Sequence, residues 1–226
     1  LMPLLLAQFT LWTLVTLLWA RLFERRGLAS LGLRLSLGTL ARYAVGLPLG
    51  VVLLAVIAIT AGVLGDIGDD AGALDMAANA TAAGLAEALS RPGVVAGLAF
   101  AAAVFLVQGG AEEVVFRGWL MSTLTARWGV RAAVIVSSVA FMLFHVHVFV
   151  SGLWFGVAAL AGIGMMGLVF ALLAVLTRSV WEAVAAHGAF NAAAVAGPTL
   201  GLPAADPIRF GAARLAEAVL YGEARS

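Results

Sequence analysis

Apolar stretches of about twenty residues, separated by short polar links, follow one another along most of the chain and limit the folds open to it. A helix of that length is what a protein needs to cross the hydrocarbon core of a membrane. Of the 226 residues, 63% are hydrophobic and only 11% are charged, which is too little charge to cover a soluble domain of this size. The sequence therefore predicts an all-α fold, a polytopic transmembrane helix bundle.

Six spans are predicted, and the chain is expected to divide into three regions. The spans are placed at residues 1–20, 43–65, from 93 through the EEVVFR motif, 132–150, 153–176 and 179–198. In the first, positive charges follow the apolar run, which is typical of a span and not of a signal peptide. The regions are residues 1–92 with two spans, 93–198 with the core that holds the site, and 199–226, a charged tail. The segment LASLGLRLSLGTLARY, residues 28–43, is too short and too charged to span and is expected in the membrane interface.

The placement of arginines predicts the orientation and the location of the protein. Arginines are frequent between residues 21 and 42, whereas the link 66–91 is acidic, so the first link is expected in the cytoplasm and the second outside. All Lys and Arg positions of the chain are Arg. This bias, together with the abundance of Ala and Gly, is typical of a bacterial genome. The arginines form no continuous patch, which argues against nucleic-acid binding. Because the chain has no Cys, disulfides, thiolate metal sites and cysteine nucleophiles are excluded.

The motif EEVVFR, residues 112–117, places three ionisable groups inside the third predicted span. Each costs roughly 2.5 to 3.5 kcal/mol at the centre of a bilayer, so such groups are paired or carry a function. Glu113 and Arg117 are four residues apart on one helix face and are predicted to form an ion pair. Glu112 is rotated by about 100° from Glu113 and is free to point elsewhere.

Two later spans bring further polar residues to a similar depth. With about 1.5 Å of rise per residue from the nearest arginine, Glu112 lies roughly 22 Å in, His145 roughly 21 Å and Asn191 roughly 20 Å, with His187 shallower at roughly 13 Å. Helical periodicity puts His147 on nearly the opposite side from His145. The long third helix is expected to bend at Gly109–Gly110. We expect Glu112, His145, His187 and Asn191 to meet at one site inside the bundle.

These motifs resemble those of the CPBP family, the CAAX proteases and bacteriocin-processing proteins that are also called Abi proteins. The family carries Glu-Glu-x-x-x-Arg, Phe-x-x-x-His and His-x-x-x-Asn on successive membrane helices. The chain has EEVVFR, FMLFH with Phe141 and His145, and HGAFN with His187 and Asn191. Every defined position matches, and the family core extends over about 90–198 of this sequence.

The resemblance implies a glutamate-dependent intramembrane endopeptidase, a hydrolase whose site opens to the cytoplasm. It implies that Glu112 is the general base that activates water, with His145 assisting. His187 and Asn191 would stabilise the oxyanion. Glu113, Arg117 and Phe141 would support the site. The implied partners are a membrane-associated peptide or protein substrate and the lipid bilayer; whether any substrate is prenylated stays open.

A metal-assisted reaction is the alternative within this reading, since family members are often labelled metalloproteases. Glu112, His145 and His187 form a set of two histidines and one carboxylate, which a divalent metal such as zinc can use. The chain has no His-Glu-x-x-His motif, and a glutamate bound to metal is no longer free as the base. Both forms of the chemistry stay open at this point.

Readings other than a protease also explain these residues. The polar groups could form a buried network that only stabilises the bundle, or the chain could be a non-catalytic bacteriocin-immunity or scaffold protein. A small proton-coupled transporter could use Glu112 and the histidines as a relay. Transporters usually show repeats or broken helices in matching halves, and none is visible in the sequence. The protease hypothesis is therefore preferred.

Overall fold

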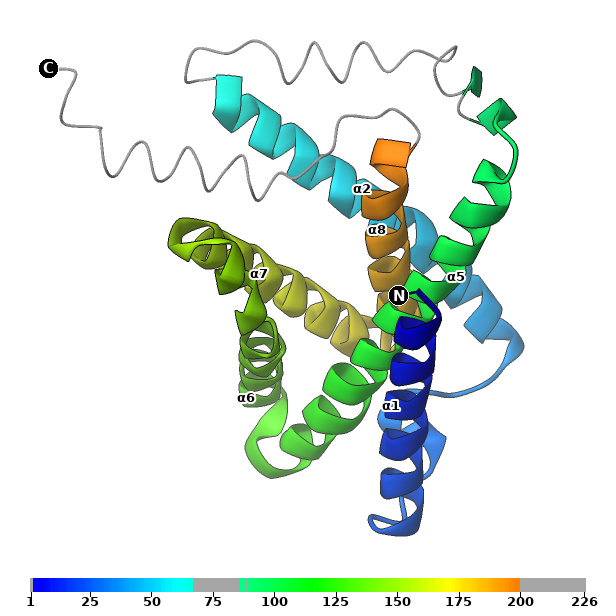
Figure 1. The fold of residues 1–226 in the computed structure, drawn as a ribbon. Coiled ribbons are helices and arrows are strands. Elements are labelled where there is room, and N and C mark those ends of the chain that lie inside the picture. The colour runs from blue at the N-terminus through cyan, green and yellow to red at the C-terminus, as the bar shows by residue number, and fades with distance from the viewer. Residues whose placement is uncertain (1, 67–85, 88, 200–226) are drawn as a thin grey trace, which may run out of the picture.

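The computed structural model describes residues 2–66, 86, 87 and 89–199 of the chain, and this part is a bundle of six α-helices without a strand (Figure 1). The helices are α1 (Met2–Leu22), α2 (Leu37–Asp66), α5 (Val94–Glu113), α6 (Met121–Phe144), α7 (Leu153–Thr177) and α8 (Trp181–Thr199). The predicted helical bundle is confirmed. The charged tail and most of the acidic link lie outside the described residues.

Four stretches of the described residues are long and apolar enough to cross a membrane: Met2–Leu22, Leu37–Ile57, Val94–Phe144 and Leu153–Thr177. The third contains both α5 and α6. The backbone at Gly129 leaves the helical region, with φ 78° and ψ 167°. Figure 1 shows that the chain turns back between the labels α5 and α6. α8 is absent from this set because it carries Glu182, His187 and Asn191. Each of the six expected spans thus has its own helix.

The long third helix changes to a π-helix over one short segment. This segment lies after Gly109–Gly110, where the sequence predicted a bend. α5 passes through Gly109 and Gly110 as regular helix, and a π-helix follows at Val114–Leu120 (η2). Gly109 serves close packing instead, because a Cβ added there would lie 2.7 Å from the backbone nitrogen of Gly188 on α8. The π-helix follows directly on Glu113, and π segments are frequent at functional sites.

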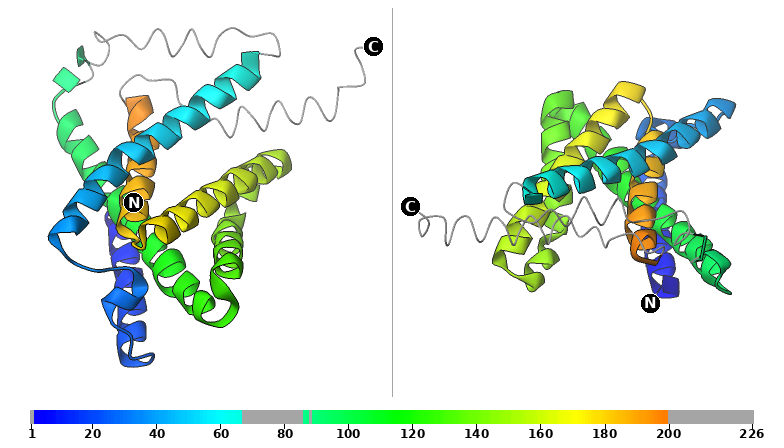
Figure 2. Two further views of the ribbon diagram at one scale, coloured as in Figure 1. Left: turned by 180° about the vertical axis from the view of Figure 1, so that it is seen from behind. Right: turned by 90° about the horizontal axis from the view of Figure 1, so that it is seen from above.

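α8 is the central helix of the bundle. It packs against α2 and α5, while α1 packs against α5 and α6 against α7. Its residues 182–189 are all buried, which explains why a helix with polar side chains stands in the interior. α7 and α8 diverge from the short link that joins them, as both Figure 1 and the reverse view in Figure 2 show. Residues of both helices line the pocket that is described below.

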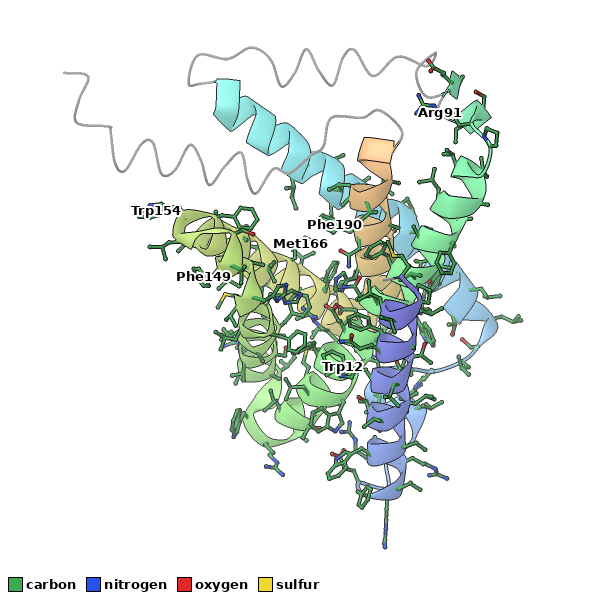
Figure 3. All side chains as sticks on the ribbon, in the orientation of Figure 1. Trp12, Arg91, Phe149, Trp154, Met166 and Phe190 are labelled. Atoms are coloured by element: carbon green, nitrogen blue, oxygen red, sulfur yellow. The ribbon has the colours of Figure 1, made fainter. Side chains whose placement is uncertain are left out.

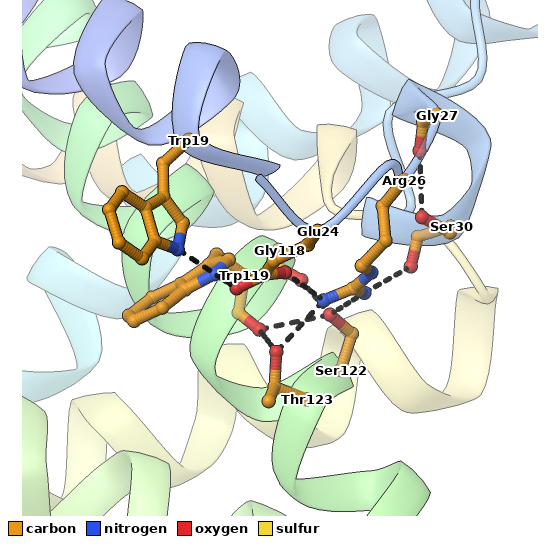
Figure 4. A network of polar contacts seen from close by, with 9 residues as sticks. All are labelled: Trp19, Glu24, Arg26, Gly27, Ser30, Gly118, Trp119, Ser122 and Thr123. Carbon is orange, nitrogen blue, oxygen red and sulfur yellow. Dashed lines mark hydrogen bonds and ion pairs between the residues drawn. The ribbon is translucent and has the colours of Figure 1, made fainter. Parts of the chain in front are cut away.

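The link between α1 and α2 is fastened to the π-helix and to the first turn of α6 by polar contacts (Figure 4). Glu24 Oε1 accepts hydrogen bonds from the indole nitrogens of Trp19 at 3.1 Å and Trp119 at 2.8 Å. Arg26 lies 3.3 Å from Glu24 Oε2 and donates to Thr123 Oγ1 at 2.8 Å. Burial acts to raise the pKa of Glu24, but these donors outweigh it and the pKa is lowered. Glu24 is therefore an ionised partner for Arg26.

In the segment 28–43, which is expected in the membrane interface, two leucines pack into the protein. It begins with a 3₁₀ turn at Leu28–Leu31 (η1), and from Leu37 it forms the first turns of α2. Leu31 and Leu33 are buried in the main apolar core. The other leucines of the segment, Leu28, Leu35, Leu37 and Leu40, are exposed, so its place in the membrane interface stays a prediction.

Candidate active site

Two adjacent carboxylates at the end of α5 are buried, with 1% of Glu112 and none of Glu113 exposed. Glu113 Oε1 accepts hydrogen bonds from Arg117 Nη1 at 2.9 Å and from His187 Nδ1 at 2.9 Å. Glu112 faces another way and accepts a hydrogen bond on Oε1 from Gln108 Nε2 at 3.2 Å. The ion pair that the spacing of Glu113 and Arg117 predicts is present, and the two carboxylates have separate partners.

Arg117 connects the π-helix to α7. Its Nη2 donates to the carbonyl oxygen of Gly167 at 2.7 Å, and its guanidinium carbon lies 4.4 Å from the centroid of the Phe141 ring. A Cβ on Gly167 would lie 3.1 Å from the Phe141 ring and 3.3 Å from Arg117 Nη2, so a glycine fits this contact best. The buried cation thus has a carboxylate, a carbonyl oxygen and an aromatic face as partners.

His145 lies at the end of α6, and its hydrogen bond fixes which ring nitrogen faces the site. Nδ1 lies 2.8 Å from the carbonyl oxygen of Phe141. A carbonyl oxygen only accepts, so Nδ1 carries the hydrogen and Nε2 is an acceptor in the neutral ring. Nε2 lies 3.8 Å from Glu112 Oε2.

His187 is held in a similar way on α8. Its Nδ1 binds Glu113, its ring stacks on Phe170 with centroids 4.9 Å apart, and its Nε2 lies 3.9 Å from Glu112 Oε2. Within the described part of the chain, Glu112 Oε2 is buried without a hydrogen-bond partner. Both histidines therefore direct Nε2 at this oxygen across a gap that one water molecule can bridge.

A pocket of about 310 Å³ opens in front of these groups. Its polar end is formed by Glu112, His145 and His187, and Asn191 lines it one turn further along α8. Its walls are largely apolar and include Met166 of α7 and Phe190 of α8, both labelled in Figure 3. The volume is at the lower end of the range of about 300 to 1,000 Å³ for ligand sites. The arrangement suits an apolar segment whose polar group reaches Glu112.

Comparison with protein families assigns this part of the chain. Residues 94–193 match the family described as Type II CAAX prenyl endopeptidase Rce1-like. The match covers somewhat less than half of the chain and contains every residue of the three motifs. Comparisons with curated proteins and with solved structures gave no match. The predicted resemblance to the CAAX proteases is confirmed, and the Rce1-like family implies a CAAX-type peptidase that works in a membrane.

The donor groups of the Rce1-like region do not fit a metal ion as they are placed. Two ligands about 2.1 Å from a tetrahedral zinc are roughly 3.4 Å apart. Glu112 Oε2 is 3.8 Å from His145 Nε2 and 3.9 Å from His187 Nε2. Across the described residues, no three His, Asp or Glu side chains are arranged to hold a metal.

Two estimates made for this region from helical geometry differ from the structure. His187 approaches Glu112 closely, although counting from Arg178 put it at a shallower level than Glu112. Its Nε2 lies 3.9 Å from Glu112 Oε2. His147 follows the end of α6 in a 3₁₀ turn, and its ring centroid lies 5.8 Å from that of His145. Helical periodicity therefore did not apply to it.

Gln108 is the residue of this site that the sequence analysis missed. It binds Glu112 with its amide nitrogen, while its Oε1 is buried without a partner inside the described structure. It also lines the pocket. A single Gln in an apolar span, four residues before a glutamate, was the signal that could have found it.

Proposed function

We propose that the protein is an intramembrane endopeptidase in which Glu112 activates water to hydrolyse a peptide bond of a membrane-tethered substrate. The observation that carries the proposal is the buried, unpartnered Oε2 of Glu112, which faces two histidine nitrogens at the end of an apolar pocket. A buried polar atom without a partner is costly. A site that presents one towards a cavity is suited to bind a water or a reacting group there.

In the proposed reaction, a water donates one hydrogen to Glu112 Oε2 and is oriented by His145 Nε2. Its oxygen attacks the substrate carbonyl carbon as the proton moves to Glu112. The Asn191 amide donates to the oxyanion. When the C–N bond breaks, the protonated Glu112 returns its proton to the leaving amine.

The neighbours of His187 support its proposed role as a second donor to the oxyanion. For this role His187 needs a hydrogen on Nε2 as well as on Nδ1, since a ring nitrogen without a hydrogen cannot donate to the oxyanion. Its Nδ1–H is already bound to Glu113, and the added proton is on Nε2. A buried cation next to a carboxylate is stabilised by it. Glu113 thus has a proposed task beyond its ion pair with Arg117.

The substrate proposed is a peptide or protein held at the membrane by a lipid or an apolar segment. The apolar walls of the pocket favour hydrophobic side chains around the scissile bond. The family description names prenyl endopeptidases, and a prenylated C-terminal tail is the form of tether that we propose to test first.

The proposal is tested with the purified chain in lipid nanodiscs and three peptides: a prenylated C-a-a-X tail, the same tail without the lipid, and an unrelated peptide with a lipid anchor. Mass spectrometry of the products should show cleavage of at least one lipidated peptide. Cleavage of the anchored peptides alike would define tethering as the requirement. Binding of the peptides without any cleavage would instead favour an immunity or scaffold protein.

Chelators are expected to leave this cleavage unchanged, because the donor distances around Glu112 do not fit a metal. The measurement is the cleavage rate after treatment with EDTA or 1,10-phenanthroline, followed by dialysis. A thermolysin reaction in the same buffers controls for effective chelation. A loss of activity that zinc restores would contradict the metal-free mechanism.

Labelling of single cysteines tests the proposed orientation in the cell membrane, with the site open to the cytoplasm. Ala29 and Ser90 are both exposed in the structure and lie in the arginine-rich and acidic links respectively. The native chain has no Cys, so the background is clean. A Cys at Ser90 should react with an impermeant maleimide in intact cells, and a Cys at Ala29 only after lysis. The reverse pattern would make extracytoplasmic peptides the expected substrates.

A further inference from the structure

A second cavity of about 380 Å³ is lined by Arg117 and lies at the arginine-rich end of the bundle. Three segments form it: the link after α1, the start of α6 with the π-helix, and the link between α7 and α8. A hydrogen bond of 3.2 Å from Val180 N to Gly32 O joins the first and third of these segments. The cavity is thus built from parts of the chain that the fold holds together.

The charged residues that line this cavity are both cations, Arg117 and Arg178. Arg117 is 1% exposed, and its Nε is buried without a hydrogen-bond partner in the described structure. Arg26 stands directly behind the wall, where it donates to Ser122 Oγ and to the carbonyl oxygen of Ser30 (Figure 4). Ser30 and Ser122 both line the cavity. Glu24 neutralises Arg26 and is not part of the lining.

The backbone at Arg178 gives a second, independent observation. Arg178 ends α7 in the left-handed region, with φ 53° and ψ 34°, where glycine is the residue without strain. The strain of a non-glycine residue at such a position is often associated with function. The conformation places Arg178 in the wall of the cavity. Ser179, beside it, accepts the backbone N–H of Trp181 on its Oγ and keeps its own hydroxyl hydrogen to donate.

We propose that this cavity binds a phosphate group, supplied by an anionic phospholipid of the leaflet at the arginine-rich end. The polar donors are Arg178, Ser179 and the free Nε–H of Arg117, while Leu31, Met121 and Val175 give an apolar wall for the glycerol and upper acyl chain. Basic pockets between helices at a membrane surface bind phospholipid headgroups on these principles. The bound phosphate would contact the guanidinium that holds Glu113, so the lipid composition would act on the geometry of the active site.

The test compares the full chain with two variants that change the backbone in the same way. Arg178→Gly removes the cation and relieves the left-handed strain. Arg25→Gly is the control, because Arg25 is the only other non-glycine residue with positive φ in the described part of the chain and does not line the cavity. Arg178→Asn, which also tolerates this conformation, serves as a second variant. Each delipidated protein is titrated in neutral detergent with phosphatidylglycerol, phosphatidylcholine and inorganic phosphate, and binding is followed by tryptophan fluorescence and by the melting temperature.

The wild type and Arg25→Gly are expected to bind phosphatidylglycerol at least about fivefold more tightly than phosphatidylcholine, the preference that one arginine near the membrane surface gives. Both Arg178 variants should lose that preference. If inorganic phosphate also raises the melting temperature of the wild type but not of Arg178→Gly, the site takes the free anion as well. Equal preference in Arg178→Gly and Arg25→Gly would overturn the proposal. Displacement of the lipid by a peptide with a free carboxylate, but not by phosphate, would overturn the phosphate assignment and indicate a site for a peptide end. None of these readouts depends on proteolysis.

Discussion

Glu112→Gln is expected to lower the rate of peptide hydrolysis by at least about a hundredfold, the smallest loss typical of removing a general base. The glutamine side chain has the same shape and can keep the hydrogen bond with Gln108, because each amide both donates and accepts. It cannot take a proton from water. Cleavage of a validated membrane-tethered peptide is measured by mass spectrometry, and the melting temperature is measured on the same preparations, where little change is expected.

Glu182→Gln is the matched control for this variant. Glu182 is also a buried carboxylate, 5% exposed, but it pairs with Arg42 at 2.7 Å and does not line the pocket. We expect it to keep cleavage close to that of the wild type. Unchanged cleavage by Glu112→Gln would refute the role of Glu112 as the base. Equal losses in both variants would indicate that loss of any buried carboxylate disturbs the fold.

The two histidine variants extend the same test. His145 binds the carbonyl oxygen of its own helix, at Phe141, so His145→Ala should abolish hydrolysis with little loss of stability. His187→Ala should abolish hydrolysis and also lower the melting temperature, since it removes the donor to Glu113 and the stack on Phe170. Full turnover by His145→Ala would exclude His145 from the reaction.

Local spacing predicted the parts of this site that lie on one helix. Glu113 and Arg117 are four residues apart, and the pair forms across one turn even though the helix widens there. The alternation of faces also separated Glu112 from Glu113, as the structure shows by their different partners. These contacts depend on the chain within one or two turns, so periodicity carries the information.

For contacts between helices, the sequence predicted which helices lie together but not which atoms bond. The order of the motifs indicated that α5, α6 and α8 share a site, but the bond from His187 Nδ1 to Glu113 depends on how deeply α8 is set beside α5. That depth follows from the close approach of Gly109 and Gly188, which a count of residues from the nearest arginine does not contain. Likewise, the acceptor for Arg117 on α7 is a backbone carbonyl, and every residue of α7 has one. No side-chain pattern could select Gly167.

Arg117→Ala is expected to destabilise the protein by about 3 to 5 kcal/mol, the cost of breaking a buried ion pair by removing one partner. Glu113 would keep only His187 as a donor on Oε1, and its Oε2 is already buried without a partner inside the described structure. The carbonyl oxygen of Gly167 and the face of Phe141 would also lose their cation. Thermal-shift measurements in detergent should show a fall in melting temperature on the order of 10 °C. Arg127→Ala, which removes an exposed arginine near the turn at Gly129, should change it little.

The double variant Glu113→Gln with Arg117→Met separates the ion pair from the shape of the side chain. Replacing both charges of a buried pair by groups of similar volume is often neutral, because no charge is left without compensation. The double variant should therefore recover much of the stability lost in Arg117→Ala. It should not recover hydrolysis, since the Gln at position 113 no longer supplies the carboxylate that stabilises a protonated His187. Single and double variants that melt at the same temperature would contradict the pairing. Recovery of both stability and hydrolysis would instead mean that the pair only holds α5 against α7, and that the proton on His187 needs no carboxylate.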